Sequence, residues 1–263
     1  MVRQSKQYLL SVIIPSRKRA NALNDTITSL LSLSDKTLDN FEIIIKIDFD
    51  DKETLDYINQ WSNEYKNISF VINSRLDGWY NLVDFVENLI DCSKGEFVWN
   101  LNDDALMLSQ DWNRVLEQRL TDFKVYYPQV KWAPDLNGYI HDFREAFPIY
   151  PKKLKELWGY LCPHNNIDNW ILEVHRRCSL DPWSEDTIEY IDNLFISHAQ
   201  IPDETSQDKL DKVDVNFNLR NHHMDSQELY HCINLLKEHK SYLRWKSINK
   251  LNIINEYKNS LES

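Results

Sequence analysis

The sequence predicts an α/β fold in which helices flank a mostly parallel central sheet. Short apolar runs alternate with amphipathic segments four times within about 100 residues, the pattern of βαβ units. The apolar runs are rich in β-branched residues and stop at polar clusters, as buried strands do. With 263 residues, the chain is long enough for one large domain, or for one domain with a small appendage.

The spacing of apolar residues predicts the individual elements of the first half. The expected strands cover 9–14, 41–47, 68–72 and 96–101. The expected helices between them cover 21–33, 53–65 and 80–90.

The second half of the chain gives weaker signals. The stretch 123–165 is aromatic and proline-bearing without a clean period, so we expect irregular strands and loops there. A helix over 169–177 and a strand over 188–197 should follow. From residue 226 the helical spacing predicts two C-terminal helices, which would serve as a lid, as simple packing or as the face of a homodimer.

Charge and glycine content exclude several function classes. The 30 basic residues against 41 acidic ones give a net charge of −11, which argues against a nucleic-acid partner. The chain has only four glycines, at Gly78, Gly95, Gly138 and Gly159, so neither GxGxxG nor GxxxxGK[ST] can occur.

The apolar runs are too short to span a bilayer, and the first residues lack the apolar core of a secretory signal. We therefore expect no transmembrane segment and a cytoplasmic location, with peripheral contact to a membrane as a further option. The cysteines are widely spaced and are expected to be buried free thiols. A zinc site from Cys162, His164, His175 and Cys178 is disfavoured, because one residue between Cys162 and His164 is tighter than usual zinc-ligand spacing.

Polar clusters follow three of the expected strands. They are the basic loop 15–19 (Pro-Ser-Arg-Lys-Arg), the acidic segment 48–51 (Asp-Phe-Asp-Asp) and the segment 102–104 (Asn-Asp-Asp). Ligands of open α/β sheets bind at the carboxyl ends of strands, and oxygen ligands favour hard cations such as Mg²⁺ or Mn²⁺. These clusters therefore suit a divalent cation and a diphosphate. The alternative is that the acidic residues only cap helices and solvate turns.

The order and spacing of these segments resemble glycosyltransferase family 2 enzymes with the GT-A fold. Residues 11–19 (SVIIPSRKR) resemble the opening strand, and 42–48 (EIIIKID) resemble the strand whose final acidic residue reads the base. Residues 95–104 (GEFVWNLNDD) resemble the strand that carries a DxD-type metal motif. The resemblance is good over 9–110 and weak to about residue 205.

The resemblance implies a GT-A domain and a helical extension. The domain would cover 1–205, with a nucleotide-binding half at 9–110 and an acceptor half at 111–205. Residues 206–263 would form the C-terminal helical extension.

The resemblance also implies roles for individual residues. Asp48 would accept a hydrogen bond from the imide of uracil, Asp103 would hold the ribose or an outer-shell water, and Asp104 would bind the metal with His198. The remaining nucleotide-binding residues would be Pro15, Ser16, Arg17, Arg75 and Gly78. This chain departs from the family at Asn102, which occupies the usual first acidic position of the motif. Either the Asn102 amide holds a ribose hydroxyl or a metal-bound water there, or Asp103 and Asp104 form a shifted motif.

The acceptor region resembles the family more weakly, through residues 147–151 and 166–170. It implies that Asp168 is the general base that deprotonates the acceptor hydroxyl, with Glu173 and Asp142 as alternatives. Asp168 would otherwise be only the N-cap of the following helix. Aromatic residues near the expected cleft suit a sugar, namely Trp79, Trp132, Tyr139 and Trp170.

Together these features imply a metal-dependent, inverting glycosyltransferase that uses Mn²⁺ or Mg²⁺. The donor would be a nucleotide-diphosphate sugar, with UDP favoured, and the acceptor a glycan, a lipid-linked molecule or a small molecule. One alternative is a non-catalytic sugar- or nucleotide-binding domain derived from the same fold. Another is a nucleotidyltransferase, which is disfavoured because residues 15–23 lack the glycine-rich loop of that class.

Overall fold

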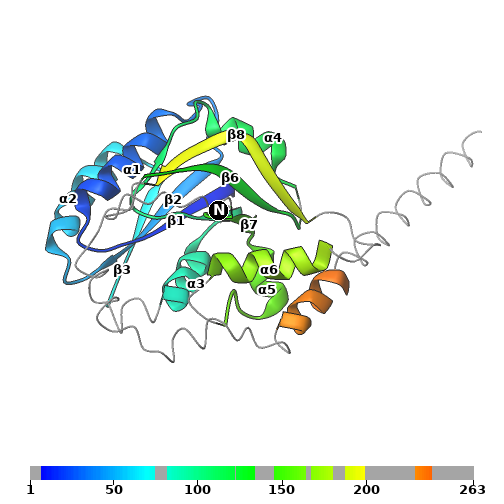
Figure 1. The fold of residues 1–263 in the computed structure, drawn as a ribbon. Helices are drawn as coiled ribbons and strands as arrows, with labels where there is room; N and C mark the ends of the chain where they lie inside the picture. The colour runs from blue at the N-terminus through cyan, green and yellow to red at the C-terminus, as the bar shows by residue number, and fades with distance from the viewer. Residues whose placement is uncertain are drawn as a thin grey trace, which may run out of the picture.

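The predicted α/β class is confirmed by a computed structural model, which describes residues 7–74, 82–121, 123–133, 145–163, 167–179, 187–198 and 229–238. Eight strands form one sheet in the order β3-β2-β1-β4-β7-β6-β8-β5, and helices lie against both of its faces (Figure 1). The helices α1, α2 and α4 contribute to one buried apolar cluster, and α3, α5 and α6 to the other.

The nucleotide-binding half predicted at 9–110 begins with a parallel sheet. Its strands are β1 (Tyr8–Ser16), β2 (Phe41–Asp48), β3 (Ile68–Asn73) and β4 (Gly95–Asn100), and they pair in parallel. The helices between them are α1 (Ala20–Ser32), α2 (Lys52–Glu64) and α3 (Leu82–Cys92). All of these elements lie within two residues of their predicted bounds. The match is close for β1, β2 and β4 because most of their residues are buried, so that these strands read as largely apolar runs, whereas β3 at the sheet edge is only partly buried.

The second half of the sheet is mixed. β7 pairs antiparallel with β4 and β6, β6 pairs parallel with β8, and β5 pairs antiparallel with β8. Its elements are β5 (Ala105–Met107), α4 (Trp112–Arg119), β6 (Val125–Trp132), β7 (Ile149–Pro151), α5 (Lys153–Trp158), α6 (Ile167–Ser179) and β8 (Ile188–His198).

Several of these elements differ from the sequence prediction. The stretch 123–165 holds a regular strand, β6, whose first four residues are all buried, so its two faces do not alternate in polarity. The helix α4 is short and mostly polar, and it is anchored by buried Trp112, whose Nε1 donates to the carbonyl oxygen of Leu30 at 2.8 Å. Tertiary contacts of this kind leave no periodic signal in the sequence.

The start of the C-terminal region forms a helix over 229–238, as predicted. Its apolar residues Leu229, Cys232, Ile233 and Leu236 are buried in the cluster that also contains residues of α5 and α6. The apolar face of this helix therefore packs against the cluster that contains α5 and α6 of the same chain. The second expected C-terminal helix and the boundary at 205/206 lie outside the described residues. Within the part of the chain that is described, no helix has the length and apolarity needed to cross a membrane.

The sheet brings the polar segments together at one edge. The parallel strands β1, β2 and β4 all end there, each followed by one of the polar clusters. The antiparallel register of β5 with β8 pairs Ala105 with His198, so the last residue of β8 lies beside the segment 102–104. A histidine far along the chain thereby joins the acidic end of β4.

The packing of β4 on β1 predicts that Gly95→Ala is strongly destabilising. A Cβ at this position would lie 2.5 Å from the backbone nitrogen of Ser11 and 2.7 Å from the carbonyl carbon of Leu10. Backbone must therefore shift in the centre of the sheet, and we expect a loss of about 3 kcal/mol in urea unfolding. Gly159→Ala is the control, since its φ of +82° is strained for alanine but its surroundings are open, with an expected loss of about 1 kcal/mol. Equal losses for the two variants would contradict this account of β4.

Candidate functional site

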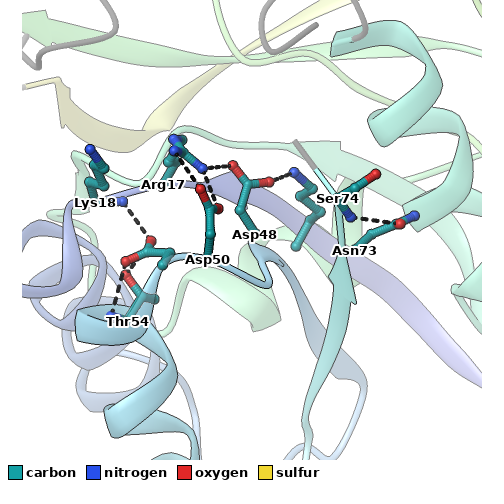
Figure 2. Close-up of polar contacts among 9 residues, drawn as sticks. Arg17, Lys18, Asp48, Asp50, Thr54, Asn73 and Ser74 are labelled. Atoms are coloured by element: carbon teal, nitrogen blue, oxygen red, sulfur yellow. Dashed lines mark hydrogen bonds and ion pairs between the residues drawn. The ribbon is translucent and has the colours of Figure 1, made fainter. Parts of the chain in front are cut away.

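The first group of polar residues surrounds Asp48 at the end of β2. Arg17 Nη1 lies 2.5 Å from Asp48 Oδ2 and 2.7 Å from Asp50 Oδ1, while Lys46 Nζ pairs with Asp48 Oδ1 (Figure 2). We call Arg17, Lys46, Asp48 and Asp50 the Asp48 cluster. Asp48 is 1% exposed, so its charge requires these partners. Hydrogen bonds to Asp50 and Asp48 raise the pKa of Arg17 above its ordinary value, against the opposing effect of burial.

The acidic residue Asp51 has a structural role instead. It caps α2 by accepting hydrogen bonds from the backbone N–H of Thr54 at 3.2 Å and from the Thr54 hydroxyl at 2.7 Å. It also accepts the backbone N–H of Lys18 at 2.6 Å, and Lys18 has a left-handed φ of +52°. Capping therefore explains one carboxylate of the segment 48–51, and it leaves Asp48 and Asp50 facing Arg17.

The second group lies at the end of β4, where Arg19 bridges two carboxylates. Its Nη1 is 2.8 Å from Asp103 Oδ1, and its Nη2 is 2.6 Å from Asp104 Oδ2. The Ser16 hydroxyl donates to Asp103 Oδ2 at 2.7 Å, and the Thr26 hydroxyl donates to the carbonyl oxygen of Asp103 at 2.9 Å. The basic loop after β1 is therefore bonded to the ends of both neighbouring strands.

His198 completes this second group from the end of β8. Its Nε2 lies 3.0 Å from Asp104 Oδ1 and 3.2 Å from the Asn102 side-chain nitrogen. The rings of Trp132 and Phe147 meet the imidazole edge-on, with centroids 4.9 and 5.1 Å away. Burial opposes ionisation of Asp104, but His198 and Arg19 outweigh it and hold the pKa of this carboxyl at about 2.

Asp168 lies in the first turn of α6, which begins at Ile167, so it is not the N-cap of a helix starting at residue 169. Its carboxylate is within reach of two hydrogen-bond donors, the side chain of Asn100 and the backbone N–H of Phe147. Burial raises its pKa to about 6, although both donors and the charge of His198 lower it in part. The carboxyl thus titrates close to neutral pH, as a general base does.

Phe147 links Asp168 to the core through a strained backbone. Its φ of +58° is rare for a large side chain, and its carbonyl oxygen accepts the Nε1–H of buried Trp99 at 3.1 Å. The same residue therefore directs a backbone donor toward Asp168 and places its ring beside His198. Strain of this kind is typical of residues that orient a functional group.

The structure brings together most of the residues that the sequence singled out. Ser16, Arg17, Asp48, Asp103, Asp104 and His198 occupy the two groups, and Pro15 lies at the end of β1 among them. Several other predicted residues lie outside the described part of the chain, namely Arg75, Gly78, Trp79, Tyr139, Asp142 and His164. Trp132 lies beside His198, whereas Trp170 is fully buried in the core.

Glu173, the alternative base on α6, is bonded to Arg177 Nε at 2.5 Å. Sequence reasoning assigned no role to Arg19, Lys46 or Asn100. Arg19 belongs to the basic loop, and its side chain is long enough to reach both Asp103 and Asp104. Lys46 had a visible signal, because a charged residue inside an apolar strand is unusual. Asn100 had no signal, since its role depends on the approach of α6.

The second group offers only a small number of protein ligands to a metal ion. Among the described residues, no group of three or more His, Cys, Asp or Glu side chains is arranged to hold a metal ion. Asp104, in the turn between β4 and β5, and His198, at the end of β8, nevertheless present an oxygen and a nitrogen 3.0 Å apart. A cation held here would take its other ligands from water or from a bound diphosphate.

Comparison with known proteins shows which family model the chain matches and which solved structures share its fold. A family model described as Glycosyl transferase family 2 matches residues 11–174. Among solved structures, S. aureus TarS 1–349 is 15% identical, with a TM-score of 0.52 over 72% of this chain and 60% of that one. The TarS 1–349 complex with UDP-GlcNAc is 13% identical, with a TM-score of 0.54 over 75% of this chain and 60% of that one.

A third structure is the mannosyltransferase PcManGT from Pyrobaculum calidifontis in complex with GDP-Man and Mn²⁺. It is 11% identical, with a TM-score of 0.59 over 88% of this chain and 70% of that one. At these identities the structural likeness shows the fold alone. None of the curated proteins compared with the chain matches it. The chain spans 60% of the length of TarS 1–349.

The raised pKa of Asp168 predicts that Asp168→Asn stabilises the protein at alkaline pH. Above about pH 6 the carboxylate is ionised in both states, and its burial costs the folded state free energy. As the pH falls from 6 toward 4, the folded state alone takes up the proton, so this cost disappears. We expect the variant to gain about 1–3 kcal/mol in urea unfolding at pH 8 and almost nothing at pH 4.

The matched control for this measurement is Glu173→Gln on the same helix. Glu173 is already paired with Arg177 at the surface, so its replacement should not stabilise the protein at either pH. A variant at position 168 that is no more stable than the wild type at pH 8 would contradict the burial of a charged Asp168.

Proposed function

The chain belongs to glycosyl transferase family 2, and we propose that it transfers a sugar from a nucleotide-diphosphate donor to a hydroxyl group of an acceptor. The observation that carries this proposal is the convergence of Asp48, Asp104, His198 and Asp168 on one edge of the sheet. These residues supply a base-binding carboxylate, a cation-binding pair and a proton acceptor, which are the groups that such a transfer needs.

The donor nucleotide would lie along the ends of β1, β2 and β4. Asp48 would accept the imide N–H of uracil, and Ser16 and Arg17 would line the nucleotide at the start of the basic loop. Asp103 is already fixed by Ser16 and Arg19, so it would present its remaining acceptor capacity to the ribose. Of the solved neighbours, one binds UDP-GlcNAc and another GDP-Man, so the preference for UDP rests on Asp48 of this chain.

A divalent cation, Mn²⁺ or Mg²⁺, would be held by Asp104 and His198. The donor chemistry fits such an ion, because a carboxylate oxygen of Asp104 and the Nε2 atom of a neutral His198 are suitable ligands and lie 3.0 Å apart. The solved mannosyltransferase neighbour contains Mn²⁺. When bound, the cation would stabilise negative charge on the diphosphate. Arg19 would support the same charge from the side of the basic loop, at the position where it now bridges Asp103 and Asp104.

Asp168 would act as the general base in a single displacement. The acceptor oxygen forms a bond to the anomeric carbon as the bond from that carbon to the diphosphate breaks, and Asp168 takes the hydroxyl proton. Attack from the face opposite the diphosphate inverts the anomeric configuration. With a pKa of about 6, Asp168 is ionised at neutral pH and remains basic enough to accept the proton.

The acceptor would approach between Asp168 and the partly exposed side chain of Trp132. The Trp132 ring meets the His198 imidazole edge-on, with centroids 4.9 Å apart, and it is backed by the buried ring of Phe147. The C–H faces of a sugar ring pack well on such surfaces, which favours an acceptor that carries a carbohydrate. A lipid-linked or small-molecule acceptor with a sugar at its reactive end would satisfy the same contacts.

The role of Asp168 predicts that Asp168→Asn lowers transfer by about 10²–10⁴-fold while leaving nucleotide affinity unchanged. In the wild type, kcat/KM should fall tenfold per pH unit below about pH 6, as Asp168 becomes protonated. The assay is release of the nucleoside diphosphate from a panel of nucleotide sugars with sugar acceptors. Glu173→Gln is the control and should keep wild-type rates.

Transfer by Asp168→Asn at more than one tenth of the wild-type rate would exclude Asp168 as the base. A wild-type protein that binds a nucleotide but transfers no sugar to any acceptor would instead favour a non-catalytic binding domain. The two outcomes are distinguishable, because only the second leaves the wild type inactive.

A further inference from the structure

Arg19 reaches the two acidic residues at the end of β4 with separate nitrogens of its guanidinium group. Its Nη1 lies 2.8 Å from Asp103 Oδ1, and its Nη2 lies 2.6 Å from Asp104 Oδ2. All three side chains are shielded from water, since Asp103 and Asp104 are 4% and 3% exposed and the Arg19 side chain is 15% exposed. Salt screens such buried charges only weakly. The charge of Arg19 therefore acts strongly on any ion that binds these carboxylates.

The two carboxylate oxygens of Asp104 face different partners. Oδ2 faces Arg19, whereas Oδ1 lies 3.0 Å from Nε2 of His198. A cation held by Asp104 and His198 would therefore share one carboxylate with the guanidinium. Two positive charges on the same carboxylate repel each other, and this repulsion is strong where water is largely excluded. Arg19 should therefore lower the affinity of Asp104 for a divalent cation.

The balance of charge differs between the two groups of the site. In the Asp48 cluster, two cations face two carboxylates, so their charges cancel (Figure 2). At the end of β4, the single charge of Arg19 faces those of Asp103 and Asp104, which leaves −1 for these three side chains. A divalent cation would change this value to +1. In a chain without Arg19, the corresponding values would be −2 and 0. Arg19 thus makes the end of β4 less attractive to a cation and, once the cation is bound, more attractive to an anion.

Resting on the proposed function, we infer that Arg19 makes the binding of the divalent cation depend on the diphosphate. Arg19 weakens cation binding at Asp104 when no diphosphate is bound, and it strengthens the binding of a diphosphate when the cation is bound. The diphosphate supplies the negative charge that offsets the guanidinium and the metal together. By linkage, each of the two ligands then raises the affinity for the other by the same factor.

Two other roles for Arg19 give different expectations. If Arg19 only orients Asp104 toward His198, its loss weakens cation binding by about 10–100-fold. If Arg19 only stabilises the folded loop after β1, its loss weakens the binding of the cation and of the nucleotide alike. The charge-balancing role predicts shifts of opposite sign for the two ligands. The signs of the two shifts therefore separate the three roles.

The experiment measures two affinities of the full chain. Binding of Mn²⁺ alone is followed by electron paramagnetic resonance, and binding of UDP and of GDP at saturating Mn²⁺ is followed by calorimetry. Compared with the wild type, Arg19→Met should bind Mn²⁺ alone about tenfold more tightly and the preferred nucleotide about tenfold more weakly. Arg19→Lys keeps the charge, so both affinities should stay within about threefold of the wild-type values.

The matched control is Arg114→Met. Arg114 also pairs with a carboxylate, that of Asp35, but it lies outside the candidate site. Its replacement should leave the affinities for Mn²⁺ and for the nucleotide unchanged.

A Mn²⁺ affinity that does not rise in Arg19→Met, or a nucleotide affinity that does not fall, would overturn this inference and leave the proposed transfer intact. A wild type that binds neither nucleotide would overturn the proposed function as well. If circular dichroism shows that Arg19→Met does not fold, Arg19→Gln decides, with opposite shifts of about threefold expected for the two ligands. Shifts of the same sign in that variant would contradict a charge-balancing role for Arg19.

Discussion

The ion pairs made by the loop after β1 are the constraint on which the rest of the site depends. Arg17 binds the end of β2 and Arg19 binds the end of β4, so one short loop joins the ends of three neighbouring strands. The carboxylates of Asp48, Asp103 and Asp104 are nearly inaccessible to water, and such charges are stable only beside opposite charges. Because the parallel strands end side by side, their carboxylates lie close together at one edge of the sheet. Arg17 and Arg19 offset the negative charge of these carboxylates, so that they can be buried in the folded state.

The same ion pairs are connected to the residues that we propose to serve the acceptor. Phe147, in a left-handed conformation, joins the buried Trp99 of β4 to Asp168 of α6, and its ring lies against His198. His198 in turn contacts Asp104, which Arg19 holds. A continuous set of contacts therefore runs from the proposed base to the ion pairs of the basic loop. The cost of a strained backbone at Phe147 is consistent with a group held in place for chemistry.

The sequence allowed the parallel half of the fold and the acidic strand ends to be predicted, because buried parallel strands give continuous apolar runs and their carboxyl ends must meet at one edge. The positions of Asp168 and His198 came from family resemblance, and the register of β5 with β8 gives the physical reason why His198 reaches Asp104. The partners Arg19, Lys46 and Asn100 were not predicted, since ion pairing and donor geometry depend on how strands and α6 approach one another. α4 and β6 were missed for a related reason, because buried tryptophan and tyrosine contacts hold them in place.

The most direct test of a single site built by these ion pairs is a crystal structure with UDP and Mn²⁺, recorded with anomalous scattering from manganese. The account predicts one manganese peak in contact with Asp104 and His198, a diphosphate beside it, and the uracil edge against Asp48. A nucleotide bound away from the ends of β2 and β4, or a manganese peak without contact to Asp104, would contradict it.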